Sequence, residues 1–389
     1  MSENNSKTMI LQMLAEGKIT VEESERLLNA VNNENNSREK SSDNENQQSS
    51  NSGFPNIPFL EATKIGLNLR NMVQTVHDTV QKTIKQVEPR SKDLKEKMRE
   101  FGGWMEEVVE TMASEITNHN GLPADSMSVD FIVPAPKGTE NCKSFIIENV
   151  YGEIHINEGP EFKLLVNGQV SKNTLGELQS SEWFSNNAIK VIDDKMYIGF
   201  DSDAQIKALI DINLTLPTGS NVVCKTINSA IKTNGALNIE VIKTVSGNVR
   251  IDASKLENTK IESVSGVIQI VNTKNINAKI NTTSGDLLIN NSGLNKLTIN
   301  TVNGDLNIHD SEIVIETQIE AITTSGDITI EKLTGPWKNI DANSRNGQVF
   351  VEWRGNLSPL NKQRVCITTG GEGAKLYADS VSGNIKFRC

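Results

Sequence analysis

Three aspartates recur at one position of a repeated phrase in the second half of the chain. Asp286, Asp305 and Asp327 each follow a glycine directly. If the repeats stack, the three carboxylates lie within about 5 to 7 Å of one another, close enough to raise a pKa or to bind a hard cation such as Ca²⁺. The equivalent positions in the other repeats are not acidic: Asn248, Val267, Gln348 and Asn384. We therefore favour the alternative, ordinary turn chemistry with a solvated side chain, and leave cation binding open.

Other kinds of catalytic chemistry would need residues that the sequence pattern does not bring together. A polysaccharide lyase or hydrolase built on a β-helix needs clustered carboxylates and a basic residue on the outward face of neighbouring coils. The outward positions of the repeats are mixed: Arg250, Gln269, Leu288, Asn307, Thr329, Phe350 and Lys386. The sequence also lacks the G-x-S-x-G, P-loop and H-E-x-x-H motifs. We assign no catalytic, cofactor-binding or metal-binding residues and predict a non-enzymatic protein, with a polysaccharide-acting enzyme as the less favoured alternative.

The element that positions these residues is a short repeat. Its motif is Thr/Ser, Val/Thr, Ser/Asn, Gly, Asp/Asn, followed by an apolar residue, any residue and a second apolar residue. It recurs at Gly247, Gly266, Gly285, Gly304, Gly326, Gly347 and Gly383, at first with a spacing of 19 residues. A fixed period of this length is typical of a solenoid, and a glycine at each corner accepts positive φ without steric cost.

Apolar residues alternate on both sides of each corner glycine. Around Gly285 they are Leu287 and Ile289 after it, and Ala278 and Ile280 before it. Alternation with period two places side chains on one side of a strand, so each coil has at least two short strands around one interior. The sequence therefore predicts a mainly β protein, with a parallel β-helix or solenoid over residues 128–389. At about 20 residues per coil, this length gives about 12 or 13 coils.

The first part of the predicted solenoid, residues 128–240, is less regular. The phrases around Gly152 and Gly235 resemble the repeat, with longer excursions between them. We interpret this part as earlier coils of the same stack.

The last residues of the chain form a strand of what we expect to be the final coil. Ile385 and Phe387 face inward by the repeat pattern. An uncovered solenoid end has unpaired backbone N–H and C=O groups, which can pair with a strand of another molecule. The candidate covers are residues 355–365, the segment before residue 118, or a second molecule docked end to end. We expect a helix of the same chain.

Two short modules open the chain. The sequence pattern of residues 1–31 predicts a helical hairpin. Gly17 ends the first helix, and Thr20 and Glu23 form a capping box for the second. This hairpin is too small to bury a core of its own and must dock on something. A DNA-reading helix-turn-helix is disfavoured because the second helix is acidic. Residues 32–58, rich in Asn, Ser, Glu and Gln, predict a disordered linker.

An amphipathic helical segment is predicted over residues 59–118. Apolar residues from Ile65 to Val87 recur in steps of three and four apart from one threonine, and a second stripe runs from Leu94 to Ile116. Residues 61–100 contain nine Lys or Arg and six Asp or Glu. We expect this segment to pack on the solenoid or on a second copy. Peripheral contact of residues 61–118 with anionic lipid is the functional alternative.

The charge balance and the cysteines limit the partners and the compartment. A net charge of -10 over 389 residues argues against nucleic acid as the partner. The polar start of the sequence and the lack of a long apolar run predict a cytoplasmic protein, with a peripheral membrane location or non-classical export to the cell surface as alternatives. Four cysteines without metal-ligand spacing predict free thiols, of which the terminal one could cross-link two chains: Cys142, Cys224, Cys366 and Cys389.

The repeat and the N-terminal hairpin both resemble known families. The repeat motif resembles the putative-adhesin family of bacterial β-strand-repeat proteins, a domain of unknown function whose members look like parallel β-helices. The hairpin from Met13 to Leu28 resembles the YvlB/LiaX N-terminal helical domain of Gram-positive bacteria. These resemblances imply a scaffold or sensor in the cell-envelope stress response, including the response to antimicrobial peptides. They name no ligand, so the partner is a protein or an envelope component of unknown identity. A surface adhesin or structural protein and self-association are the alternatives.

Overall fold

The computed structural model of the chain describes residues 126–171, 181–199, 208–353, 356–357, 362–369 and 371–389. The predicted hairpin (1–31), linker (32–58) and amphipathic segment (59–118) lie outside the described residues. All that follows concerns the second of the two compact units of the chain, Pro58–Cys389.

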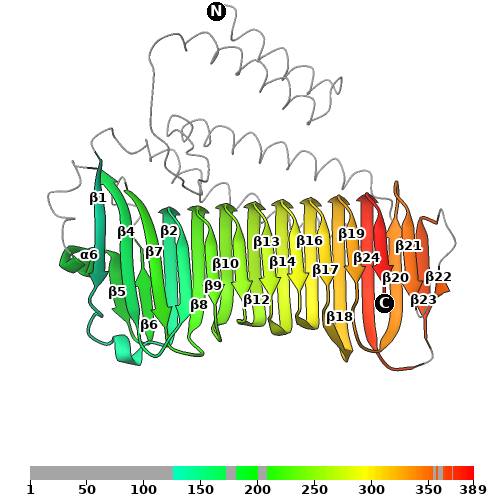
Figure 1. Cartoon of the computed structure of the whole chain (residues 1–389), viewed down its shortest axis with the longest axis horizontal. Coiled ribbons are helices and arrows are strands. Elements are labelled where there is room, and N and C mark those ends of the chain that lie inside the picture. The colour runs from blue at the N-terminus through cyan, green and yellow to red at the C-terminus, as the bar shows by residue number, and fades with distance from the viewer. Residues whose placement is uncertain (1–125, 172–180, 200–207, 354–355, 358–361, 370) are drawn as a thin grey trace, which may run out of the picture. The chain divides into compact units, whose positions relative to one another are not determined.

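Two long sheets contain most of the described residues (Figure 1). Sheet A contains, in spatial order, β1 (Ser126–Val133), β4 (Lys163–Ser171), β7 (Ala208–Leu216), β3 (Ile154–Glu158), β9 (Ile231–Asn234), β11 (Val249–Asp252), β13 (Ile268–Val271), β15 (Leu287–Asn290), β17 (Leu306–His309), β19 (Ile328–Glu331), β25 (Ile385–Arg388), β21 (Val349–Trp353) and β22 (Asn356–Leu357). Sheet B contains, from the other end, β23 (Arg364–Thr368), β20 (Trp337–Ser344), β24 (Ala374–Ser382), β18 (Glu312–Ser325), β16 (Gly293–Asn303), β14 (Lys274–Ser284), β12 (Lys255–Ser265), β10 (Asn238–Ser246), β8 (Asn221–Asn228), β2 (Ser144–Tyr151), β6 (Lys195–Ile198) and β5 (Ile189–Ile192). The described helices are the 3₁₀ turn η2 (Thr139–Asn141) and α6 (Ser181–Ala188).

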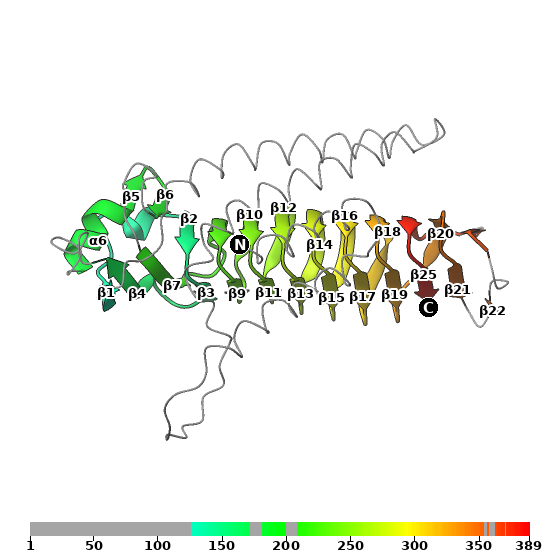
Figure 2. The ribbon, with the colours of Figure 1, turned by 90° about the horizontal axis from the view of Figure 1, so that it is seen from above.

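The predicted stack of parallel strands is confirmed. The two sheets run as two rows of strands (Figure 2), and their inward side chains meet in one core. Ile289 pairs in register with Ile270 on one side and Ile308 on the other, and each of the three side chains is at most 1% exposed. The alternation read from the sequence therefore assigns the inward residues of the regular repeats correctly.

The coil count was predicted too high. Nine coils in the described residues run from a strand of sheet B through a corner to a strand of sheet A. Gly152 is such a corner, between β2 and β3, but Gly235 lies at the opposite turn, between β9 and β10. Alternation around a glycine looks the same at either turn, so the pattern alone could not separate them.

The described excursions between β3 and β7, residues 159–171 and 181–199, do not repeat the coil pattern. β4 pairs antiparallel with both β1 and β7, and β5 and β6 form an antiparallel hairpin. Helix α6 packs on β1 and β5, where Phe184 and Phe131 meet edge to face with ring centroids 5.8 Å apart. This end of the stack is thus closed by elements that do not follow the repeat.

The other end of the stack corrects a prediction. β25 is indeed a strand with Ile385 and Phe387 facing inward, but it lies between β19 and β21 and is not terminal. β24 is likewise inserted between β18 and β20. The stack ends instead with β22, antiparallel to β21, and β23, antiparallel to β20. One of the predicted candidates, the stretch around residues 355–365, therefore supplies the described edge, and no helix among the described residues does so.

Candidate functional site: the coil corners and the outer face of sheet A

The three aspartates lie side by side at the corners, where each one binds the backbone of the next coil. The backbone N–H of Asp305 donates to Asp286 Oδ1 at 2.9 Å, and that of Asp327 donates to Asp305 Oδ1 at 2.8 Å. Each carboxylate is therefore a hydrogen-bond acceptor that ties two coils together. Asp286 and Asp305 thus use Oδ1 between coils and not within their own turns.

The same ladder continues through the amides at equivalent positions. Asp327 accepts from the N–H of Asn384, and Asn384 Oδ1 accepts from the N–H of Gln348 at 3.0 Å. The order of the ladder follows the spatial order of β19, β25 and β21 and not the order of the sequence. At the other end, Asn248 Oδ1 accepts from Val267, whose own side chain has no acceptor to offer the next coil.

The glycines allow these corners to approach closely. Gly285 has φ of 148°, and a Cβ built on it would lie 2.1 Å from the carbonyl oxygen of Gly266. The other regular corners repeat this geometry; a Cβ on Gly304 would lie 2.2 Å from the oxygen of Gly285. Any side chain here would separate the coils, so glycine is required twice, for its φ and for its lack of a Cβ.

A row of buried hydroxyls lies just inside the corners, three residues before each glycine. Its members are 0–2% exposed, and their hydroxyl oxygens find no hydrogen-bond partner: Thr244, Ser263, Thr282, Thr301 and Thr323. In the last two coils the row is satisfied, because Ser380 and Ser344 donate to glycine carbonyls. The sequence interpretation noted the Thr or Ser of the motif but assigned it no role; the structure places it as a small buried side chain next to the corner.

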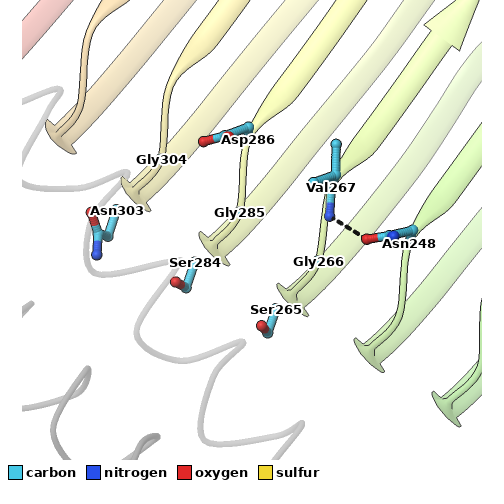
Figure 3. A pocket seen from close by; sticks show the side chains of 9 residues that line it. All are labelled: Asn248, Ser265, Gly266, Val267, Ser284, Gly285, Asp286, Asn303 and Gly304. Atoms are coloured by element: carbon cyan, nitrogen blue, oxygen red, sulfur yellow. Dashed lines mark hydrogen bonds between the residues drawn. The ribbon is translucent and has the colours of Figure 1, made fainter. Parts of the chain in front are cut away.

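The corners of four adjacent coils enclose a shallow groove of about 350 Å³ (Figure 3). Backbone and small polar side chains line it: Asn248, Ser265, Gly266, Val267, Ser284, Gly285, Asp286, Asn303 and Gly304. The lining contains one carboxylate and no His, Cys, Lys or Arg. Among the described residues, no three His, Cys, Asp or Glu side chains come together in a way that could hold a metal ion. Polar groups in the groove can form hydrogen bonds with a ligand. The lining contains no acid–base pair and no basic side chain that could activate a serine as a nucleophile.

The outer face of sheet A is the broader surface. The predicted outward residues lie in register across it, in the spatial order Arg250, Gln269, Leu288, Asn307, Thr329, Lys386 and Phe350. Its middle, from Gln269 to Thr329, carries only half-buried uncharged side chains in this row. The result is an uncharged strip across four coils.

Charged residues flank this strip and are paired with one another. On one side Glu153 contacts His155 and Lys232, and these hydrogen bonds lower the pKa of Glu153. On the other side Lys386 lies 2.5 Å from Glu331 and lowers the pKa of that carboxyl. The outward carboxylates are thus held ionised by partners within the face, which is unlike a general acid poised near neutral pH.

Two protein-family models match parts of this chain. A model of the Toastrack DUF4097 family matches residues 78–388. The chain belongs to the Toastrack DUF4097 family. A SHOCT-like domain model also matches residues 5–36, which overlap most of the predicted N-terminal hairpin. No curated protein matches the chain.

One solved structure resembles this Toastrack protein at low similarity. It is the crystal structure of a putative cell adhesion protein from Clostridium sporogenes. The match has 13% sequence identity and a TM-score of 0.22, and covers 68% of this chain and 99% of the other.

None of the described helices has the length and apolarity to cross a bilayer. All four cysteines are free thiols in the structure. Cys224 is buried and Cys366 is exposed, while burial raises the pKa of half-buried Cys389 to about 11. A thiol with that pKa stays protonated at neutral pH, which disfavours the predicted oxidative cross-link through Cys389.

Proposed function

We propose that this Toastrack protein is a non-enzymatic scaffold or sensor of the bacterial cell-envelope stress response, which binds a protein or envelope component through the solenoid. The observation that carries the proposal is the outer face of sheet A. The backbone of its uncharged strip is held in register by the parallel ladder, and the charges that flank the strip are already paired. Such a surface can bind without reorganisation and carries no catalytic constellation.

The link to envelope stress is supported by the N-terminal part of the chain. Residues 13–28 resemble the YvlB/LiaX helical domain, and a small hairpin joined to a long repeat domain suits a module that reports on what the repeat domain binds. We propose a cytoplasmic location, with peripheral membrane association as the alternative.

Cell fractionation tests this proposal. We expect the protein in the cytosol or at the inner surface of the membrane, and we expect envelope stress to change the proteins that co-purify with it. Recovery in the culture medium or on the outer surface, with no change under stress, would contradict the proposal and favour an adhesin.

A structural or adhesive role is the second candidate, and one observation favours it. The edge strands β1 and β5 at the same end of the stack each expose an isoleucine, with Ile132 59% and Ile192 56% exposed. Exposed apolar side chains on edge strands promote strand-to-strand association. A sedimentation coefficient that rises with protein concentration would support self-association, provided that Ile132→Lys and Ile192→Lys abolish the rise. A protein that stays monomeric at all concentrations would argue against it.

A further inference from the structure

A band of side chains on the outer face of sheet B is buried. One row lies two residues before the corners: Ile227, Val245, Val264, Thr283 and Val302. A second row lies four residues before the corners: Glu262, Asn281, Asn300, Ile322 and Asp379. All ten residues are at most 9% exposed. We refer to these ten residues as the sheet B band.

The sheet B band points away from the core between the sheets. Within β12, for example, Ile261 and Ser263 face inward, so Glu262 and Val264 must face outward. The apolar members of the band are buried, but they do not belong to the core cluster. The contacts among described helices and strands place no element over the band. Outward side chains that are buried to this degree need a cover from outside the two sheets.

We propose that the amphipathic segment, residues 59–118, docks along the sheet B band. The sequence pattern of the segment predicts apolar stripes but no apolar surface within the segment for them to pack on. The second part of the segment falls within the family match at residues 78–388. The proposal replaces the predicted role of this segment as a cap on the solenoid end.

The dimensions of the band fit a helix. The band runs from β8 to β24, across seven strands, so its length is about 29 Å at about 4.8 Å per strand. A helix of about 19 residues covers that distance. One turn rises about 5.4 Å, close to the strand spacing, so an apolar residue in every turn meets nearly every strand. The stripes from Ile65 to Val87 and from Leu94 to Ile116 have this periodicity and are long enough.

The outline of the band also fits a helix that crosses the strands obliquely. On β8 and β10 the row nearer the corner is buried, while Lys225 and Lys243 in the other row stay accessible. On β18 and β24 the situation is reversed, with Ile322 and Asp379 buried. Both rows are buried only on β12, β14 and β16. A cylinder lying at an angle to the strands leaves such a diagonal footprint.

Charge complements the shape. The band buries two carboxylates, Glu262 and Asp379. Lys243 and Lys260 lie 3.1 and 2.5 Å from Glu262, while burial raises the pKa of Asp379. The nine basic and six acidic residues of positions 61–100 suit such a surface better than an acidic segment would. Docking there leaves the outer face of sheet A exposed. It also buries the apolar stripes, so that they are not available to contact lipid.

Cross-linking of lysines in the intact chain tests the docking. We expect links from Lys82, Lys85 and Lys95 to lysines on the outer face of sheet B, such as Lys260 and Lys279. The internal control is the outer face of sheet A, where Lys232 and Lys386 are also accessible and should give few links. Links spread equally over both faces, or none to sheet B, would overturn the proposal. In a mixture of ¹⁴N and ¹⁵N protein, links that join the two isotopes would show a second copy as the cover and would also overturn it.

A pair of variants on one strand sharpens the test. Val245 lies in the band and Val241 lies outside it on the same outward side of β10, half-buried. Val245→Asp should lower the yield of links from the segment to sheet B about tenfold or more, because docking would bury an unpaired carboxylate. Val241→Asp should leave the yield unchanged. Val76→Asp in the segment, which leaves the solenoid itself intact, should repeat the loss; equal yields in all three variants would refute the docking.

Discussion

Leu287 and Leu288 give the sharpest test of which side chains the solenoid buries. They are identical neighbours on β15, but Leu287 faces the core with 0% exposure and Leu288 lies half-buried on the outer face. Leu287→Ala removes the equivalent of about three methylene groups, worth about 2.4 kcal/mol in transfer free energy at about 0.8 kcal/mol each. The cavity that it leaves cannot collapse easily, because Ile268 and Leu306 are held in register on both sides. We therefore expect a loss of about 3 to 4 kcal/mol in the free energy of unfolding.

Leu288→Ala is the matched control. Its ladder neighbours are Gln269 and Asn307, and we expect a loss of less than about 1 kcal/mol. Urea denaturation of both variants, followed by circular dichroism, measures the two losses from the midpoint and slope of each transition. Losses of equal size, or a larger loss for Leu288→Ala, would refute the assignment of inward and outward positions.

Three further predictions concern the corners, the band and the thiols. Val267→Asn should supply the acceptor that the corner ladder lacks at this coil and stabilise the protein by about 0.5 to 1.5 kcal/mol, whereas Val267→Leu should not; equal melting of the two variants would contradict the role of the ladder. Burial raises the pKa of Asp379 above the ordinary value of 3.8, so this group destabilises the fold progressively as the pH rises from about 3.8 towards the raised pKa; Asp379→Asn should raise the melting temperature at pH 7, and an advantage that persists well below pH 3.8 would contradict this cause. Iodoacetamide should modify exposed Cys366 first at pH 8 and Cys389 only as the pH approaches 11; rapid modification of Cys389 at pH 8 would show that it is not shielded.

The regular coils could be predicted from the sequence because their information is local. Gly285, Leu287 and Ile289 specify a corner and the inward side of a strand within a few residues, and the structure has them in these places. The order of the stack is not local. The repeat around Gly383 looks like the others, yet its coil is inserted before the coil of Gly347, because β22 and β23 first turn back along the edge.

The candidate site also has a part that the local sequence reveals and a part that depends on residues distant in the chain. The recurrence of Asp286, Asp305 and Asp327 was visible in the sequence, but their partners were not. Each carboxylate binds a backbone N–H that is 19 to 57 residues away. The local pattern suggests a cation site or a self-contained turn, and it contains no sign of an acceptor role between coils. The sheet B band was missed for a related reason, since its outward residues are ordinary in type and only their burial distinguishes them.

We propose that the outer face of sheet A is the surface through which this protein serves the envelope stress response. An envelope-stress reporter tests this in the bacterium that produces the protein, with the chromosomal copy replaced by variants that fold normally. We expect Gln269→Lys combined with Asn307→Lys to alter the reporter as deletion does, while Asn295→Lys, exposed on sheet B, should behave as wild type. A deletion strain with an unchanged stress response, or a double variant that behaves as wild type where deletion does not, would refute this role of the face.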